Sequence, residues 1–192
     1  MAFLRVVSNE AGATVRAERL YLRSPAPGDY QDWAELREAS RAFLSPWEPT
    51  WPADDLTRTA FRRRLRRYQR DIRDDHCYPF FLFRLADDAL LGGLTLSNIR
   101  RGVSQSCSLG YWMGAQHAGR GYMSEAVRAV TPFAFGTLRL HRIEAACLPS
   151  NARSIALLEN AGFQREGLAR RFLFIDGRWQ DHLLFALLAE DQ

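Results

Sequence analysis

The chain has 192 residues, of which 47% are hydrophobic and 25% are charged, so it can bury a core without a disulfide or a metal ion. All 26 basic residues are arginine, because the sequence contains no lysine. This excludes mechanisms that need a primary amine on a side chain, such as Schiff-base catalysis and the GK[ST] phosphate loop. The net charge of +4 mildly favours acidic partners such as nucleotides, coenzyme phosphates or RNA.

The cysteines and histidines are few and scattered. Cys77, Cys107 and Cys147 form no CxxC motif, and the four histidines show no metal-ligand spacing, so we expect no metal site. An odd, sparse cysteine count and an N-terminus without a long apolar stretch favour a cytoplasmic protein. The longest strongly apolar run, residues 183–189, is far shorter than the roughly 20 residues of a membrane-spanning helix, so we expect no membrane partner.

The first third of the chain predicts a strand, a helix and a proline-rich loop. Apolar and charged residues alternate over 19–23, which is typical of a half-buried strand. Asp29 is placed to cap a helix that continues to Phe43. Three prolines then predict an ordered, non-helical loop over 43–55, which presents Trp47, Glu48 and Trp51 outward.

An amphipathic helix is predicted over 57–73. Apolar residues recur at helical spacing on one face, and eight arginines occupy the other faces. This Arg58–Arg73 surface is either a contact for RNA or the ribosome, or a solvated face in a protein that uses arginine at every basic position.

The rest of the chain predicts a meander of three strands followed by βα units and a hairpin, which together favour a mixed α/β structure of the α+β class. The expected strands are residues 78–85, 89–99, 106–113 and 141–148, with two more around Gly177; the expected helices are residues 122–137 and 154–160.

The segment from Gln116 to Gly121, with sequence QHAGRG, lies between a predicted strand and a predicted helix. Two glycines at a helix entrance let the backbone approach a ligand closely, and the first helical amides point toward it. This predicts a phosphate or pyrophosphate cradle that uses backbone amides and Arg120. A Rossmann dinucleotide site is disfavoured, because that motif follows the first strand of its fold and precedes several βα units.

Gln116–Gly121 resembles the Q/R-x-x-G-x-G/A signature of the GNAT superfamily of acetyl-CoA-dependent N-acetyltransferases. Other segments are similar to its ribosomal-protein alanine acetyltransferase branch, and they cover about residues 14–189 of one domain spanning 1–192. These segments are PWEP at 46–49, SNIRRG at 97–102, LGYWMG at 109–114, HRIEA at 141–145, NARSIALLENAGFQREG at 151–167 and IDGRWQDHLLFAL near the C-terminus.

The resemblance implies a twisted mixed sheet with flanking helices, which splits into a V after its third and fourth strands. The pantetheine arm of acetyl-CoA would lie in the split and pair with the backbone of Tyr111 and Met113. The implied coenzyme-binding residues further include Gln116, His117, Gly119, Arg120, Gly121, Tyr122, Met123 and Asn151. His117 would contribute its backbone amide, and Asn151 is equally suited to capping the helix that follows it.

Acetyl transfer needs a group that stabilises the oxyanion, an acid for the leaving thiolate and a means of removing the amine proton. A backbone N–H between Tyr111 and Met113 suits the first task. Many members of the superfamily place a tyrosine acid where this chain has Leu158, so the resemblance points instead to Ser154, whose alternative role is that of an ordinary first-turn serine.

Three candidates remain open for the base: Glu48, Glu144 and a water relay. Glu48 ranks slightly ahead, with Trp47 and Trp51 as aromatic walls for the acceptor. Glu144 is equally explained by an ion pair with Arg142 on the same strand face. An α-amine has a pKa of about 7.7–8.0, so a weak base suffices.

The expected activity is direct transfer of an acetyl group from acetyl-CoA to the α-amine of a protein N-terminus, such as the N-terminal alanine of a ribosomal protein. The alternatives are a small-molecule amine as acceptor, such as an antibiotic or a polyamine, and a ribosome- or RNA-associated factor that retains the coenzyme site. A covalent cysteine intermediate is disfavoured, because no cysteine lies in the cradle.

Overall fold

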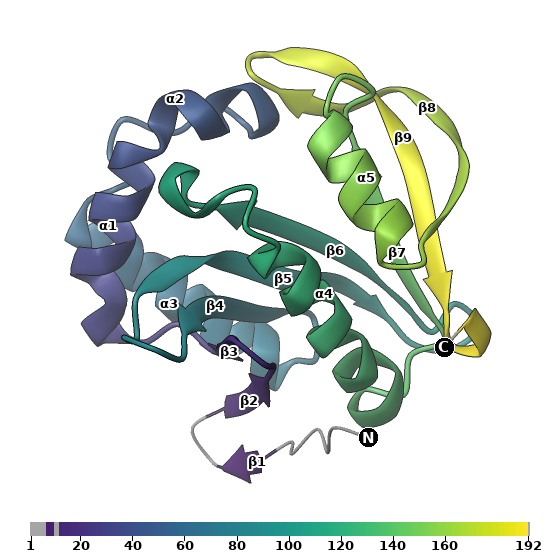
Figure 1. The fold of residues 1–192 in the computed structure, drawn as a ribbon, viewed down its shortest axis with the longest axis horizontal. Helices are drawn as coiled ribbons and strands as arrows, with labels where there is room; N and C mark the ends of the chain where they lie inside the picture. Colours follow the sequence, from purple (N-terminus) through teal and green to yellow (C-terminus); the bar gives the residue numbers. More distant parts are fainter. Residues whose placement is uncertain (1–6, 10–11, 192) are drawn as a thin grey trace.

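The computed structural model describes residues 7–9 and 12–191. Within them, nine strands form one sheet in the order β1-β2-β3-β4-β5-β6-β7-β9-β8, and β6–β7 is the parallel pair (Figure 1). The strands are β1 (Val7–Asn9), β2 (Gly12–Arg16), β3 (Leu20–Arg23), β4 (Tyr78–Arg84), β5 (Leu90–Arg100), β6 (Ser106–Met113), β7 (Arg142–Cys147), β8 (Gln164–Ile175) and β9 (Arg178–Leu188). The α-helices are α1 (Tyr30–Ala39), α2 (Arg41–Leu44), α3 (Arg58–Arg73), α4 (Tyr122–Pro132) and α5 (Ala152–Asn160).

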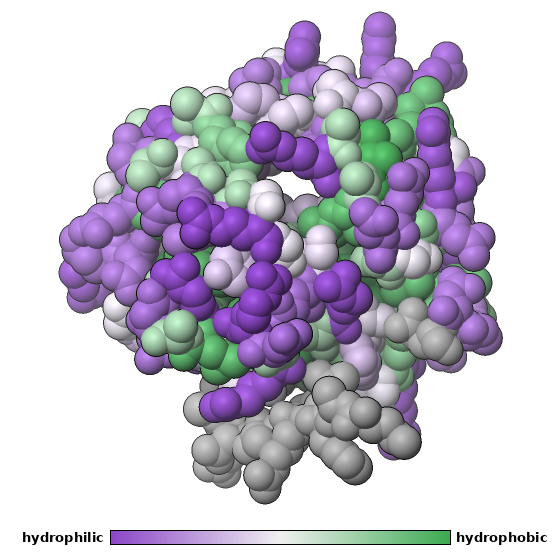
Figure 2. Space-filling view, viewed as in Figure 1, coloured by the Kyte–Doolittle hydropathy of each residue, from purple (hydrophilic) through white to green (hydrophobic). Residues whose placement is uncertain are grey.

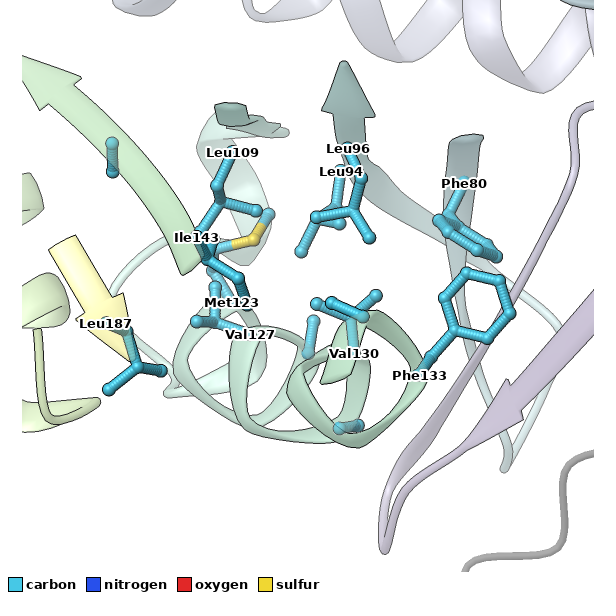
Figure 3. Close-up of a cluster of buried hydrophobic side chains, with 14 of the residues drawn as sticks. Phe80, Leu94, Leu96, Leu109, Met123, Val127, Val130, Phe133, Ile143 and Leu187 are labelled. Atoms are coloured by element: carbon cyan, nitrogen blue, oxygen red, sulfur yellow. The ribbon is translucent and has the colours of Figure 1, made fainter. Parts of the chain in front are cut away.

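Helices cover both faces of this sheet, and strand alternation decides what each face buries. Along β4, Phe80 and Leu82 pack into the core beneath α4, whereas Phe81 and Phe83 pack against α1 and α3. Figure 3 shows the first core, in which Met123, Val127 and Val130 of α4 lie against side chains from β4, β5, β6 and β7. Burial of these apolar side chains holds α4 and its N-terminal loop to the middle of the sheet.

The sheet opens between β6 and β7. These two strands pair only from Ser106 to Leu109, whereas β6 stays paired with β5 as far as Met113. Gly114 donates its N–H to Leu91 of β5, so strand alternation turns the backbone groups of Tyr111 and Met113 toward the open side. The split therefore follows β6, the fourth of the strands expected from sequence. It exposes the backbone of Tyr111 and Met113, the two positions that the resemblance implied for the pantetheine arm.

The helix predicted to continue to Phe43 breaks at Ser40, which separates α1 from α2. The Ser40 hydroxyl is buried and accepts a hydrogen bond from Ala115 N–H, which ties the break to the end of β6. The predicted cap is also wrong. Asp29 makes no side-chain bond to α1, because its carboxylate binds Arg23 and the N–H of Ala26.

The proline-rich loop is partly helical, since Ser45–Trp47 forms a 3-10 turn where a non-helical segment was expected. The prediction failed there because proline at the start of a turn presets a helical φ as readily as it breaks a helix.

Most predicted elements in the second half of the chain are confirmed within two residues at each end. The helix expected over 122–137 is α4 followed by a wider π-helical turn at Phe133–Thr137, just past Pro132. The C-terminal hairpin turns at Asp176–Gly177, both with positive φ. The sequence did not predict β1 and β2, which are short, and none of the described helices is long and apolar enough to cross a membrane.

Candidate active site

A cavity of about 870 Å³ lies at the split of the sheet. Its lining comes from α2 and the loop after it, the free end of β6, the loop before α4, and the start of α5. Figure 2 shows the surface hollowed between the half that carries α2 and the half that carries α5. The sequence-predicted site residues in the lining are Trp47, Glu48, Tyr111, Met113, His117, Gly119, Gly121, Tyr122, Met123, Asn151 and Ser154.

One end of the cavity is formed by the loop before α4. Gly119 and Gly121 have φ of +75° and +79°, a conformation in which side chains are strained, and a Cβ at Gly119 would meet nothing within 4 Å. Gly121 caps α4 without any side-chain bond, and the first N–H bonded within the helix is that of Glu125. The amides of the preceding turn are therefore available to an anionic ligand at the positive end of the helix.

Arg19, just before β3, braces this loop from outside the cavity. Its Nε donates to Glu125 Oε2 at 2.7 Å, and Nη1 donates to the carbonyl of Arg120 at 3.2 Å. The guanidinium also lies 4.8 Å from the ring centre of Tyr122. These contacts fix the loop while leaving its amides free.

Gln116 and Arg120 are predicted ligand residues that do not line the cavity. Gln116 Nε2 lies 3.1 Å from His117 Nε2. The His117 ring is buried and lines the cavity, and its Nδ1 has no hydrogen-bond partner among the described residues. Burial, reinforced by Arg84 and Arg120, lowers the pKa of His117, so the imidazole is neutral at neutral pH.

Tyr111 and Ser154 meet across the split. Tyr111 Oη lies 2.6 Å from Ser154 Oγ, and burial raises the pKa of Tyr111 to about 12. Asn151 Oδ1 accepts the N–H of Ser154 at 3.1 Å, which confirms that Asn151 caps α5. Because the cap uses only the amide oxygen, the NH₂ group of Asn151 remains free to donate into the cavity.

The other end of the cavity contains Glu48, held by residues that do not line it. Arg37 of α1 donates Nη1 to Oε1 at 2.8 Å and Nη2 to Oε2 at 2.7 Å, and Trp51 Nε1 donates to Oε2 at 2.7 Å. The Arg37 guanidinium is stacked 4.0 Å from the ring centre of Trp51. Trp51 therefore supports Glu48 and does not form the second aromatic wall expected from sequence, whereas Trp47 lines the cavity as expected.

Glu144 lies away from the cavity. Its carboxylate accepts a 2.9 Å hydrogen bond from Arg142, which also pairs with Glu166 of β8. The ion pair considered as an alternative is thus confirmed, and the geometry does not bring Glu144 together with the other candidates. No group of three or more potential metal ligands occurs among the residues that the structure describes.

A family model described as an acetyltransferase (GNAT) domain matches residues 19–164. The chain belongs to the GNAT acetyltransferase family. It is 37% identical over 177 residues to a probable N-acetyltransferase, YjcK, of Bacillus subtilis, covering 92% of this chain and 98% of that one. It is 34% identical over 184 residues to the [ribosomal protein uS5]-alanine N-acetyltransferase of Escherichia coli, covering 96% and 95%. The structure of Mycobacterium smegmatis RimJ in complex with CoA-disulfide has a TM-score of 0.85 at 33% identity, covering 98% of this chain and 86% of that one.

Membership of the GNAT family confirms the resemblance and the fold that it implied.

The sequence did not predict three contacts that support this site. They are the Arg37–Glu48 pair, the Tyr111 hydroxyl and the Arg19–Glu125 brace. Arg37 lies one turn before the helix break, and its only sequence signal is its place four residues after Trp33, on the face of α1 that the structure buries. Arg19 bonds to a residue 106 positions later in the sequence, and Tyr111 bonds to one 43 positions later. No local sequence pattern predicts contacts at such separations.

Proposed function

We propose that the protein transfers the acetyl group of acetyl-CoA directly to the α-amine of a protein N-terminus, with the N-terminal alanine of a ribosomal protein as the acceptor class. The observation that carries the proposal is one continuous cavity that runs from the glycine cradle to Glu48 past Tyr111 and Ser154. The names of the uS5-alanine N-acetyltransferase and RimJ relatives support this choice of acceptor. An acceptor of this class implies a cytoplasmic enzyme, and the three free cysteines support that location.

Acetyl-CoA fits the residues present. Its pyrophosphate would meet the uncapped amides at the start of α4, where Gly119 leaves the backbone open. Its pantetheine arm would pair with the free backbone groups of Tyr111 and Met113, and Asn151 would donate to it. Acetyl-CoA supplies the activated acetyl group, and the chain supplies orientation and hydrogen bonds.

Glu48 is better suited to holding the acceptor than to removing its proton. A carboxylate offers about four acceptor positions, and Arg37 and Trp51 occupy three of them. The remaining position can accept a hydrogen bond from the incoming amine. Since the pKa of an α-amine is about 7.7–8.0, a large fraction is already neutral at pH 8, and water can take the proton.

The charge of the cavity separates a peptide acceptor from a polyamine. Glu48 is the sole carboxylate among the described lining residues, and it is paired with Arg37. A polyamine carries several positive charges and needs several carboxylates in its site. A peptide N-terminus carries one positive charge, for which one carboxylate suffices. Trp47, Phe43 and Leu44 line the same end and suit a small, apolar first side chain such as alanine.

The test is intact-mass analysis of peptides that begin with alanine, serine or methionine, and of spermidine, after incubation with acetyl-CoA and the protein. We expect one acetyl group on the alanine peptide, lost on Gly119→Trp, because the indole would fill the cradle. Preferential acetylation of spermidine would replace the proposed acceptor with a small-molecule amine. Coenzyme binding without acetylation of any acceptor would favour a folded ribosomal substrate.

We propose separately that α3 is a contact surface for RNA. Arg62, Arg66 and Arg70 are exposed and have no salt-bridge partner in the described part of the chain, whereas Arg63 and Arg64 pair with Asp54 and Asp55. Binding to a polyanion would weaken steeply with salt. The measurement is the salt dependence of RNA affinity, compared with that of the Arg62→Gln, Arg66→Gln, Arg70→Gln variant.

A further inference from the structure

The hydrogen bond between Tyr111 and Ser154 joins the two halves of the split sheet. Tyr111 belongs to the part of β6 that has already separated from β7. Ser154 lies in the first turn of α5, which packs on β7 and β8. At 2.6 Å between the two oxygens, this contact fixes a side chain from each half at the point where the cavity crosses the split.

Ser154 is held at both its backbone and its side chain. Its N–H donates to Asn151 Oδ1 at 3.1 Å, and its hydroxyl is bonded to Tyr111. A serine hydroxyl without such a partner rotates to suit its surroundings. Tyr111 therefore restricts the direction in which Ser154 can donate its own proton.

The environment decides which oxygen is the donor. Burial raises the pKa of Tyr111 to about 12 and also raises the pKa of the neighbouring Cys147 thiol, so both groups stay neutral at neutral pH. A phenol is more acidic than an aliphatic hydroxyl and is the better donor of the two. Tyr111 then donates to Ser154 Oγ, which leaves the Ser154 proton for a second acceptor. The neutral thiol of Cys147 is one such acceptor, and a thiolate in the cavity is a stronger one because it is charged.

We propose that Tyr111 is a positioning residue that aims the hydroxyl of Ser154 at the sulfur leaving group of acetyl-CoA. This inference rests on the proposed acetyltransferase function. The amine nitrogen forms a bond to the acetyl carbon, the carbon–sulfur bond breaks, and its electron pair stays on sulfur. Ser154 stabilises that negative charge by a hydrogen bond. The acceptor loses one proton to water, and the sulfur later takes one proton from water.

Ser154 should donate a hydrogen bond to the leaving thiolate without transferring its proton, because the thiol is more acidic than serine or Tyr111. An ordinary thiol has a pKa of about 8.5, so a thiolate is too weak a base to deprotonate serine or a tyrosine as weakly acidic as Tyr111. Ser154 therefore acts as a donor to the leaving group without ionising. The same contact is available to the thiolate of the free product, coenzyme A.

The experiment compares the affinity of the protein for coenzyme A with its affinity for desulfo-coenzyme A, which lacks the sulfur, at pH 9 by calorimetry. We expect the wild-type chain to prefer coenzyme A by roughly tenfold or more, as for a hydrogen bond to a charged group. Tyr111→Phe and Ser154→Ala should each remove most of that preference, and the double variant should lose little more. The matched control is Tyr78→Phe, which removes a partly buried phenol that binds Asp75 outside the cavity.

Steady-state kinetics provides the second readout. Tyr111→Phe should lower kcat about tenfold and leave the KM for acetyl-CoA nearly unchanged, because the contact strengthens only as charge develops on sulfur. A Tyr111→Phe variant that keeps both the wild-type preference for the thiol and the wild-type kcat would overturn the inference. A wild-type chain that binds neither form of the coenzyme would instead overturn the proposed function.

Discussion

The guanidinium of Arg37 and the carboxylate of Glu48 form a bidentate ion pair with N–O distances of 2.8 and 2.7 Å, between α1 and the loop that lines the cavity. Arg37 is almost fully buried, with 7% of its side chain exposed, and Glu48 retains 19%. Aromatic rings from Trp51 and Trp112 lie 4.0 and 5.0 Å from the guanidinium. The pair thus anchors the loop to α1 and also fixes the position of Glu48, the one carboxylate in the described lining.

Replacing Arg37 by methionine should destabilise the chain and release Glu48. Glu48 would keep its bond from Trp51 and its access to the cavity but would lose two charged hydrogen bonds, which costs about 2 kcal/mol in the free energy of unfolding. The Arg37→Met, Glu48→Gln double variant should recover part of that loss, since neither charge remains. Urea denaturation measures both values. The control is Arg63→Met, because Arg63 pairs with Asp54 in solvent and should contribute little.

Replacing Gly119 by alanine should weaken coenzyme binding as well as lower stability through backbone strain. Alanine at positive φ costs about 1–2 kcal/mol, and Gly102 provides a matched case because it has φ of +66° with nothing within 4 Å. Gly119→Ala and Gly102→Ala should therefore lose similar stability in urea. Only Gly119→Ala should weaken binding of coenzyme A in calorimetry. Equal binding by both variants would remove the cradle from the coenzyme site.

The cradle and the C-terminal hairpin could be predicted from sequence because both depend on short-range patterns. Gly119 and Gly121 stand directly before α4, and Asp176–Gly177 is a turn dipeptide between two apolar segments. The contacts that complete the site depend on topology. Tyr111 meets Ser154 only because β6 and β7 run parallel and then separate, and strand pairing of this kind is not encoded in either segment alone.

Glu144 shows the reverse case, in which a plausible sequence candidate lies elsewhere. A carboxylate in the middle of a strand next to an arginine fits a base and an ion pair equally well, and only the sheet register distinguishes the two. Glu144 stands between Ser108 and Ala186 in the ladder, and its carboxylate is directed to Arg142.

Glu144→Gln should accordingly leave peptide acetylation unchanged. The pair with Arg142 is partly exposed, so the loss in free energy of unfolding should stay under about 1 kcal/mol. Glu48→Gln is the informative comparison and should raise the KM for the peptide, since it removes charge from the acceptor end of the cavity. The measurement is kcat and KM for both variants with one alanine peptide. A large fall in kcat for Glu144→Gln alone would return Glu144 to the mechanism.

The free energy of unfolding should fall as the pH rises above about 8.5. The absence of lysine simplifies this measurement, because lysine side chains would otherwise titrate in the same range. Burial raises the pKa of Cys107 to about 12 and of Cys77 to about 11, while Tyr78, through burial and its bond to Asp75, also reaches about 12. In the unfolded chain thiols ionise near pH 8.5 and phenols near about 10. The folded state binds these protons more tightly, so its advantage is complete below pH 8.5 and is lost as the pH rises toward 12.

Urea denaturation at pH 8, 9.5 and 11 checks this expectation. One pKa unit corresponds to about 1.4 kcal/mol, so Cys107 alone should account for a loss of about 2 kcal/mol between pH 9.5 and 11. Cys107→Ala should lower stability at pH 8 through lost packing, yet flatten the decline above pH 9. No ammonium side chain titrates in this range, because arginine keeps its charge and lysine is absent. An equally steep decline in the variant would mean that the Cys107 thiol ionises normally in the folded chain.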